Sequence, residues 1–110
     1  MNRLRMTGCP TALMRRLLQR AGEDRDRIFL SEWKSVDWQS LTLDGERHEA
    51  SFVVSEDEAM AFADLWLAGL SEAEFELPRG FIADIEVNAG PRLRDDDAVE
   101  IEISALTLDD

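Results

Sequence analysis

The sequence predicts a single α+β domain built on an antiparallel β-sheet of about five strands. Two segments, residues 10–22 and 55–70, repeat apolar residues at helical spacing, and several others alternate apolar and polar residues as half-buried strands do. The length of 110 residues fits one domain. The predicted element order is α-ββ-α-βββ, with the helix 55–70 packed on one face of the sheet.

Charge divides the chain into a basic head and an acidic body. Residues 1–27 carry a net charge of +4 and residues 28–110 one of −16, which gives −12 for the whole chain. An acidic body repels polyanions, so we expect no direct contact with nucleic acid and none with an anionic membrane. It attracts cationic surfaces. The expected partner is therefore a protein, either one with a basic surface or a second copy of this chain.

Cysteine content and hydropathy set the expected location. The chain has one cysteine, so no internal disulfide can form, which fits a reducing compartment. No apolar run approaches the length of a membrane span. We therefore expect a cytoplasmic protein.

The beginning of the chain is predicted to have two parts. Residues 1–9 form a flexible basic head, and the single domain extends from residue 10 to residue 110. The domain opens with an amphipathic helix over residues 10–22, in which Pro10 suits the first position and Gly22 the stop. Arginines occupy the side opposite its apolar stripe, and so short a helix needs a surface to pack on.

A hairpin follows the first helix. Residues 28–43 are rich in β-branched and aromatic residues, but their apolar parity changes, which predicts a bulge near residues 34–35. Asp44-Gly45 is typical of a hairpin turn.

The register of this hairpin is predicted from how it sorts the side chains. A three-residue turn over residues 43–45 pairs Val36 with Phe52 and Trp38 with Ala50. This register gathers the apolar residues on one face, whereas a two-residue turn mixes polar and apolar residues on both.

The helix over residues 55–70 has the strongest pattern in the chain. Ser55 and Glu58 form the spacing of a capping box, and Gly69 marks the end of the helix. Its apolar face consists of Ala59, Phe62, Ala63, Trp66, Leu67 and Leu70.

Three strands complete the predicted sheet. They cover residues 73–77, 81–87 and 99–108, with a turn at 78–80 and a polar connection at 89–98.

The last two of these strands alternate acidic and aliphatic residues. If they pair, Asp84, Glu86, Glu100 and Glu102 share one face of the sheet. Carboxylates that lie directly opposite one another are destabilising. This acidic face has two interpretations: it is a solvated surface that resists aggregation, or it is a surface that binds a cationic partner.

No residue pattern points to catalysis, a metal or a cofactor. His48, the only histidine, is expected on a strand opposite Ser40, without a partner for acid–base chemistry. One histidine and one cysteine cannot supply the four ligands of a zinc site. The run of aspartates at residues 95–97 lacks the spacing of a calcium loop, and no glycine-rich phosphate motif is present.

Trp33 is the best single candidate for a contact residue, because it lies outside the main apolar phase of its strand. The other interpretation is that it packs under the first helix.

The leading hypothesis is a non-enzymatic protein–protein interaction domain or self-associating domain. Its acidic sheet face, with Asp84, Glu86, Glu100 and Glu102, contacts a basic partner surface, and Trp33 contributes to the contact. The alternative is a small ligand-binding or enzymatic domain with a pocket between the helices and the sheet, near His48 and Trp33.

Overall fold

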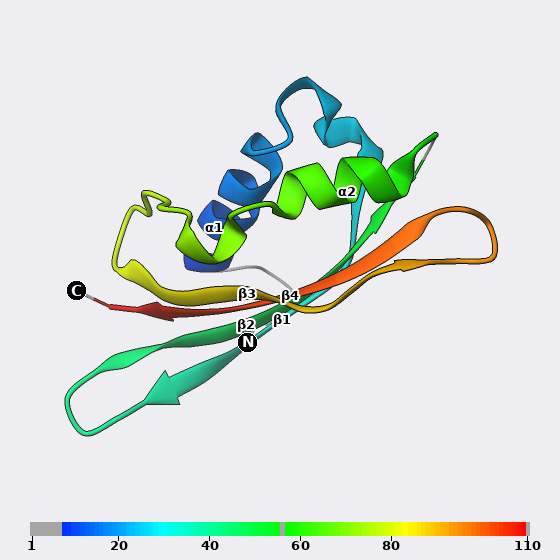
Figure 1. Cartoon of the computed structure of the whole chain (residues 1–110). Coiled ribbons are helices and arrows are strands. Elements are labelled where there is room, and N and C mark those ends of the chain that lie inside the picture. Colours follow the sequence, from blue (N-terminus) through cyan, green and yellow to red (C-terminus); the bar gives the residue numbers. More distant parts are fainter. Residues whose placement is uncertain (1–7, 56, 110) are drawn as a thin grey trace.

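The protein is an α+β fold of two layers, in which one antiparallel sheet carries helices on one face (Figure 1). The computed structural model describes residues 8–55 and 57–109. The sheet has four strands in the order β1-β2-β4-β3. The elements are α1 (Gly8–Gln19), the 3₁₀ helix η1 (Gly22–Arg27), β1 (Ile28–Gln39), β2 (Asp44–Val54), α2 (Ala59–Leu67), the 3₁₀ helix η2 (Leu70–Glu72), β3 (Phe81–Leu93) and β4 (Val99–Leu108).

The predicted fold class is confirmed, but the prediction of about five strands was wrong. Residues 73–77, expected to be a strand, have no regular secondary structure. Phe75 packs against the core, and the carbonyl of Glu76 accepts a hydrogen bond from Arg16 Nε at 2.9 Å. The segment is therefore bound to the side chain of Arg16 in α1 and is not hydrogen-bonded to a neighbouring strand. The third strand, β3, extends instead through part of the predicted connection, as far as Leu93.

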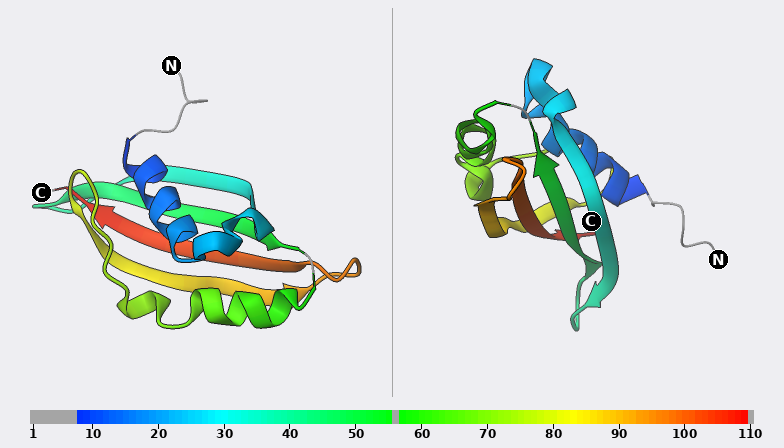
Figure 2. Two further views of the ribbon diagram at one scale, coloured as in Figure 1. Left: turned by 90° about the horizontal axis from the view of Figure 1, so that it is seen from above. Right: turned by 90° about the vertical axis from the view of Figure 1, so that its right-hand side faces the viewer.

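The two halves of the chain repeat one order of elements, a helix followed by a hairpin. The hairpins β1–β2 and β3–β4 join through the antiparallel pair β2–β4, so β2 and β4 are the central strands of the sheet. Figure 2 shows α1 over the β1–β2 half and α2 along the side of β3. Both helices lie on the same side of the sheet, and the opposite side faces solvent.

The core lies between this helical layer and the sheet. Trp66 of α2 is 4% exposed and meets Phe52 of β2 edge to face, with ring centroids 5.3 Å apart. Its indole Nε1 donates to the carbonyl of Leu17 at 2.9 Å, which ties α2 to α1. The predicted apolar face of α2 is confirmed, because every member is buried or half-buried. The inward residues of the last strand, Val99, Ile101, Ile103 and Ala105, are also buried as predicted.

The N-terminal end of α2 differs from the prediction. The helix begins at Ala59 rather than at Ser55, and Glu58 precedes it in a left-handed conformation with φ 57° and no side-chain cap. The predicted capping box is therefore not formed. Gly69, with φ 73°, ends this region as expected.

The predicted register of the first hairpin was wrong. Val36 pairs with Arg47 and Trp38 with Gly45, while Ala50 lies opposite Trp33. The shift is an odd number of residues, so it exchanges the two faces of β1.

The turn explains the error. Ser40 closes a four-residue turn: its main-chain N–H donates to the carbonyl of Leu43 at 2.8 Å, and its Oγ accepts from Leu43 N–H at 3.1 Å. Asp44-Gly45, expected to form the turn, belongs to β2. The expected break in β1 is present at Ser31, between Leu30 and Glu32, not near residues 34–35.

The first helix begins at Gly8, two residues before the predicted start, and residues 1–7 of the predicted flexible head lie outside the described part. It ends at Gln19, and Arg20, the residue that follows, contacts the C-terminal end of α2. Arg20 donates to the carbonyls of Trp66 and Ala68, with Nη2 distances of 3.1 and 2.7 Å. A cation at these carbonyls complements the negative end of the α2 dipole.

Arg27, at the end of η1, approaches the other end of α2. It donates to the carbonyls of Ser55 and Asp57, and its guanidinium lies 4.6 Å from the ring centroid of Phe62. Basic residues from the first quarter of the chain thus hold both ends of α2. In the described ranges, no helix has the length and apolarity needed to cross a membrane.

Candidate interaction face of the sheet

The solvent-facing side of the sheet, here called the open face, is the side opposite α1 and α2. Its side chains follow from the register of the three strand pairs. Along β1 and β2 it carries Phe29, Glu32, Lys34, Val36, Trp38, Arg47, Glu49, Ser51 and Val53; along β4 and β3 it carries Glu100, Glu102, Ser104, Leu106, Phe81, Asp84, Glu86, Ala89 and Arg92.

The structure brings the four predicted carboxylates together on this face, because β3 and β4 are hydrogen-bonded neighbours. It does not place them opposite one another. Asp84 pairs with Leu106 and Glu86 with Ser104. Glu102 lies between Ser51 of β2 and Ala89 of β3.

The bulges in β3 produce this stagger, since each one shifts the register by a residue. Each acid consequently has a neutral or cationic cross-strand neighbour. The repulsion expected from directly opposed carboxylates is avoided.

Glu100 differs from the other three acids because two arginines approach it. Arg92 lies opposite Glu100 across the β3–β4 pair and donates from Nη2 to its Oε1 at 2.6 Å. Arg94 Nε is 3.8 Å from Oε2. The hydrogen bond to Glu100 raises the pKa of Arg92. Glu100 is thus partly neutralised within the chain.

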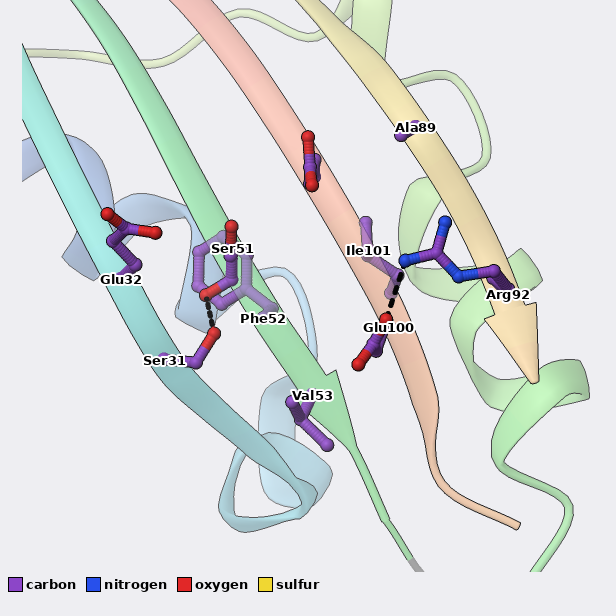
Figure 3. Close-up of a pocket in the computed structure, with 10 residues that line it drawn as sticks. Ser31, Glu32, Ser51, Phe52, Val53, Ala89, Arg92, Glu100 and Ile101 are labelled. Atoms are coloured by element: carbon purple, nitrogen blue, oxygen red, sulfur yellow. Dashed lines mark hydrogen bonds and ion pairs between the residues drawn. The ribbon is translucent and has the colours of Figure 1, made fainter. Parts of the chain in front are cut away.

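A shallow depression of about 320 Å³ lies on the open face, toward the end of the sheet where β4 begins. Figure 3 shows Glu32 of β1 on one side and Arg92 of β3 on the other, with Ser51 and Glu100 between them. Glu102 also lines the depression. Within the described ranges, Glu32 and Glu102 form no ion pair, so their carboxylates remain open to a cation from outside.

One end of the open face carries exposed apolar side chains beside Arg47 and Asp84. Val36 is 61% exposed and Phe81 47% exposed, and half-buried Trp38 and Leu106 lie in the same two cross-strand rows. The hairpin predicted from sequence placed Val36 and Trp38 in the core, so this patch was missed. The signal that could have found it is Ser40, whose hydroxyl organises the true turn.

Trp33, the predicted contact residue, lies on the helix-facing side and not with the four carboxylates. It pairs with buried Ala50, and its Nε1 donates to Ser35 Oγ at 2.9 Å. Its ring centroid is 5.9 Å from that of His48. It is half-buried and packs against the core.

His48 lies in the middle of a continuous chain of hydrogen bonds. It pairs with Ser35 rather than with Ser40, and Ser35 Oγ is 2.7 Å from His48 Nδ1. On its other side, His48 Nε2 is 2.9 Å from Thr107 Oγ1, which donates to the carbonyl of Glu46 at 3.4 Å.

The donors fix the tautomer of this histidine. Thr107 Oγ1 donates its one proton to the carbonyl of Glu46, so it accepts from His48 Nε2–H. Nδ1 is then the acceptor and takes the proton of the Ser35 hydroxyl, while Ser35 Oγ accepts from Trp33 Nε1–H. Burial lowers the pKa of His48 to about 4, so the ring is neutral near pH 7. At 1% exposure and with both nitrogens occupied, it has no free atom for acid–base chemistry.

Two like charges lie directly opposite one another on the helix-facing side of the sheet, near the turn between β1 and β2, where Asp37 pairs with Glu46. Burial, and after it the charges of Asp37 and Asp109, raise the pKa of Glu46. In the part of the chain that the structure describes, no group of three histidine, cysteine or acidic side chains is arranged to hold a metal ion.

Comparison with known proteins yields no family model, curated protein or solved structure that matches this chain.

Proposed function

We propose that the protein is a non-enzymatic interaction domain whose open face binds a cationic surface of another protein. The observation that carries this proposal is the composition of the face: six carboxylates stand among three basic side chains, next to an exposed apolar end. The carboxylates are Glu32, Glu49, Asp84, Glu86, Glu100 and Glu102, and the basic residues are Lys34, Arg47 and Arg92.

The two parts of the face have different roles in such a contact. The carboxylates select and steer a basic partner, because complementary charge raises the association rate and excludes acidic competitors. The apolar end around Val36 and Phe81 supplies area whose removal from water stabilises the complex. A partner that fits both parts has lysine or arginine side chains beside an apolar patch.

Two features of the sheet favour this function over a pocket near His48 and Trp33. The ring of His48 is enclosed by Ser35 and Thr107, so a ligand there would have to break two hydrogen bonds. The depression on the open face is accessible without any rearrangement, and Glu32 and Glu102 line it.

Affinity capture with charge-matched baits tests the proposal. One bait carries Glu49→Gln, Glu86→Gln and Glu102→Gln on the open face. The control bait carries Glu23→Gln, Glu72→Gln and Glu74→Gln, three exposed positions outside the sheet. Both baits lose three negative charges, so only the location of the charges differs between them.

The expected result is a basic protein retained by the wild-type and control baits and lost by the open-face bait. Its retention should also fall between about 0.1 M and about 1 M salt, since the screening length shortens from about 10 Å to about 3 Å. Equal retention by both variant baits would contradict the proposal.

A further inference from the structure

The two outer strands of the sheet differ in how well they can accept another strand. In β3, the register shifts three times, between Ile82 and Asp84, between Val87 and Ala89, and between Ala89 and Arg92. Pro91 within this region also lacks a main-chain N–H. Bulges and proline are the usual devices that protect a sheet edge from further pairing.

The edge formed by β1 has neither a bulge nor a proline over most of its length, and its charged side chains are Glu32, Lys34 and Asp37. After the single bulge at Ser31, pairing with β2 runs without interruption from Glu32 to Gln39. Within the described ranges β1 pairs only with β2, so its other side carries unpaired main-chain groups. Val36, in the middle of this stretch, is 61% exposed.

An antiparallel pair of two β1 strands has a two-fold axis perpendicular to the sheet, so residues opposite one another must belong to the same face. Centring the axis on Val36 satisfies this rule and places the two exposed valines against each other. Lys34 then lies opposite the partner's Trp38, and Ser35 opposite the partner's Asp37. No like charges are directly opposed, and a lysine meets an aromatic ring.

We propose that two copies of this chain pair through their β1 edges, with Val36 on the two-fold axis, and form one continuous eight-stranded sheet. The two open faces then lie on the same side of that sheet, and their exposed apolar ends around Val36 and Trp38 meet at the axis. This dimer is independent of the proposed binding of a basic protein, because its formation is measured on the purified chain alone.

Solution mass tests the pairing with two substitutions at one position. Val36→Glu leaves the fold intact, because the new carboxylate lies opposite Arg47 of its own chain, but it places two like charges against each other across the axis. Val36→Thr keeps a neutral β-branched residue. By light scattering at about 0.1 mM chain, the wild type and Val36→Thr should have twice the 12.5 kDa mass of one chain, and Val36→Glu the mass of one chain.

Crosslinking tests the register even if Val36→Glu disturbs folding. In a Cys9→Ser background, Val36→Cys should form an intermolecular disulfide under mild oxidation, because opposite residues of an antiparallel pair have Cα atoms within disulfide range. Asp84→Cys, an exposed position on β3, is the matched control and should crosslink at least tenfold more slowly.

A wild-type chain that remains monomeric would overturn the proposal. So would a Val36→Glu variant that is still a dimer, or equal crosslinking rates at positions 36 and 84.

Discussion

Ser35 Oγ and His48 Nδ1 lie 2.7 Å apart, in a hydrogen-bond chain that runs from the indole of Trp33 to the main-chain oxygen of Glu46. The chain joins β1, β2 and β4 on the helix-facing side of the sheet. It satisfies every polar group of a buried histidine, which identifies His48 as a structural residue.

The lowered pKa of His48 predicts a specific loss of stability in acid. Folding keeps the ring neutral down to about pH 4, whereas the unfolded chain binds a proton near pH 6.5. The contribution is therefore fully present above pH 6.5 and is lost as the pH falls towards 4. Its full size is about 3 kcal/mol in the free energy of unfolding.

Urea unfolding of the wild type and of His48→Gln across this pH range measures the effect. Carboxylates titrate in part of the same range, so the difference between the two proteins is the informative quantity. It should shrink steadily from pH 7 to pH 4. A difference that is independent of pH would show that the histidine is accessible to protons.

The hydrogen bonds of Arg20, which directly follows α1, predict that this arginine stabilises the fold. Arg20→Ala leaves the carbonyls of Trp66 and Ala68 without their donor and should cost about 1.5–3 kcal/mol. Arg15→Ala, at an exposed position of α1, should change stability by less than about 0.5 kcal/mol. Chemical denaturation of both variants checks this, and equal effects would mean that net charge rather than the two hydrogen bonds matters.

Trp66 is predicted to be the most sensitive core position. Trp66→Ala should cost about 3–5 kcal/mol, since it leaves a large cavity against Phe52. Trp66→Phe keeps a ring but removes the indole donor to the Leu17 carbonyl, which still accepts from the main-chain N–H of Arg20 at 3.2 Å, and should cost about 0.5–1.5 kcal/mol. Thermal unfolding separates the two variants. A loss below about 1 kcal/mol for Trp66→Ala would contradict the packing described for α2.

Because the carboxylates of the open face are staggered, replacing them with neutral side chains is predicted to leave the stability of the fold nearly unchanged. Glu86→Gln combined with Glu102→Gln should change the free energy of unfolding by less than about 0.5 kcal/mol, because neither acid faces another across a strand pair. Denaturant titration at low salt checks this. A loss of more than about 2 kcal/mol would mean that these acids are held by buried cations.

The sequence was sufficient where local pattern and burial agree. The apolar faces of α2 and β4 follow directly from periodicity, and the acidic alternation of Glu100 and Glu102 is on the side predicted. The β2–β4 pair has no register shift, so the alternation of β4 is undisturbed.

The sequence was insufficient where residues far apart along the chain decide the local structure. Asp44-Gly45 has the composition of a turn, yet both residues belong to β2. Position 45 requires glycine because a Cβ there would meet the main-chain oxygen of Thr107. The need for glycine at this position is set by β4, more than sixty residues away, and local pattern does not report it. The bulges of β3 are equally hidden, and they decide which residues face Asp84 and Glu86.

The most direct measurement is methyl NMR of the protein bound to the basic partner that the capture experiment retains. Val53 and Leu106 carry methyl groups on the open face, whereas exposed Leu65 marks the outside of α2. Binding at the open face should shift the methyl resonances of Val53 and Leu106 and leave those of Leu65 unchanged. Shifts at Leu65, with Val53 and Leu106 unaffected, would show that the partner binds the helical layer and that the open face is only a solvated surface.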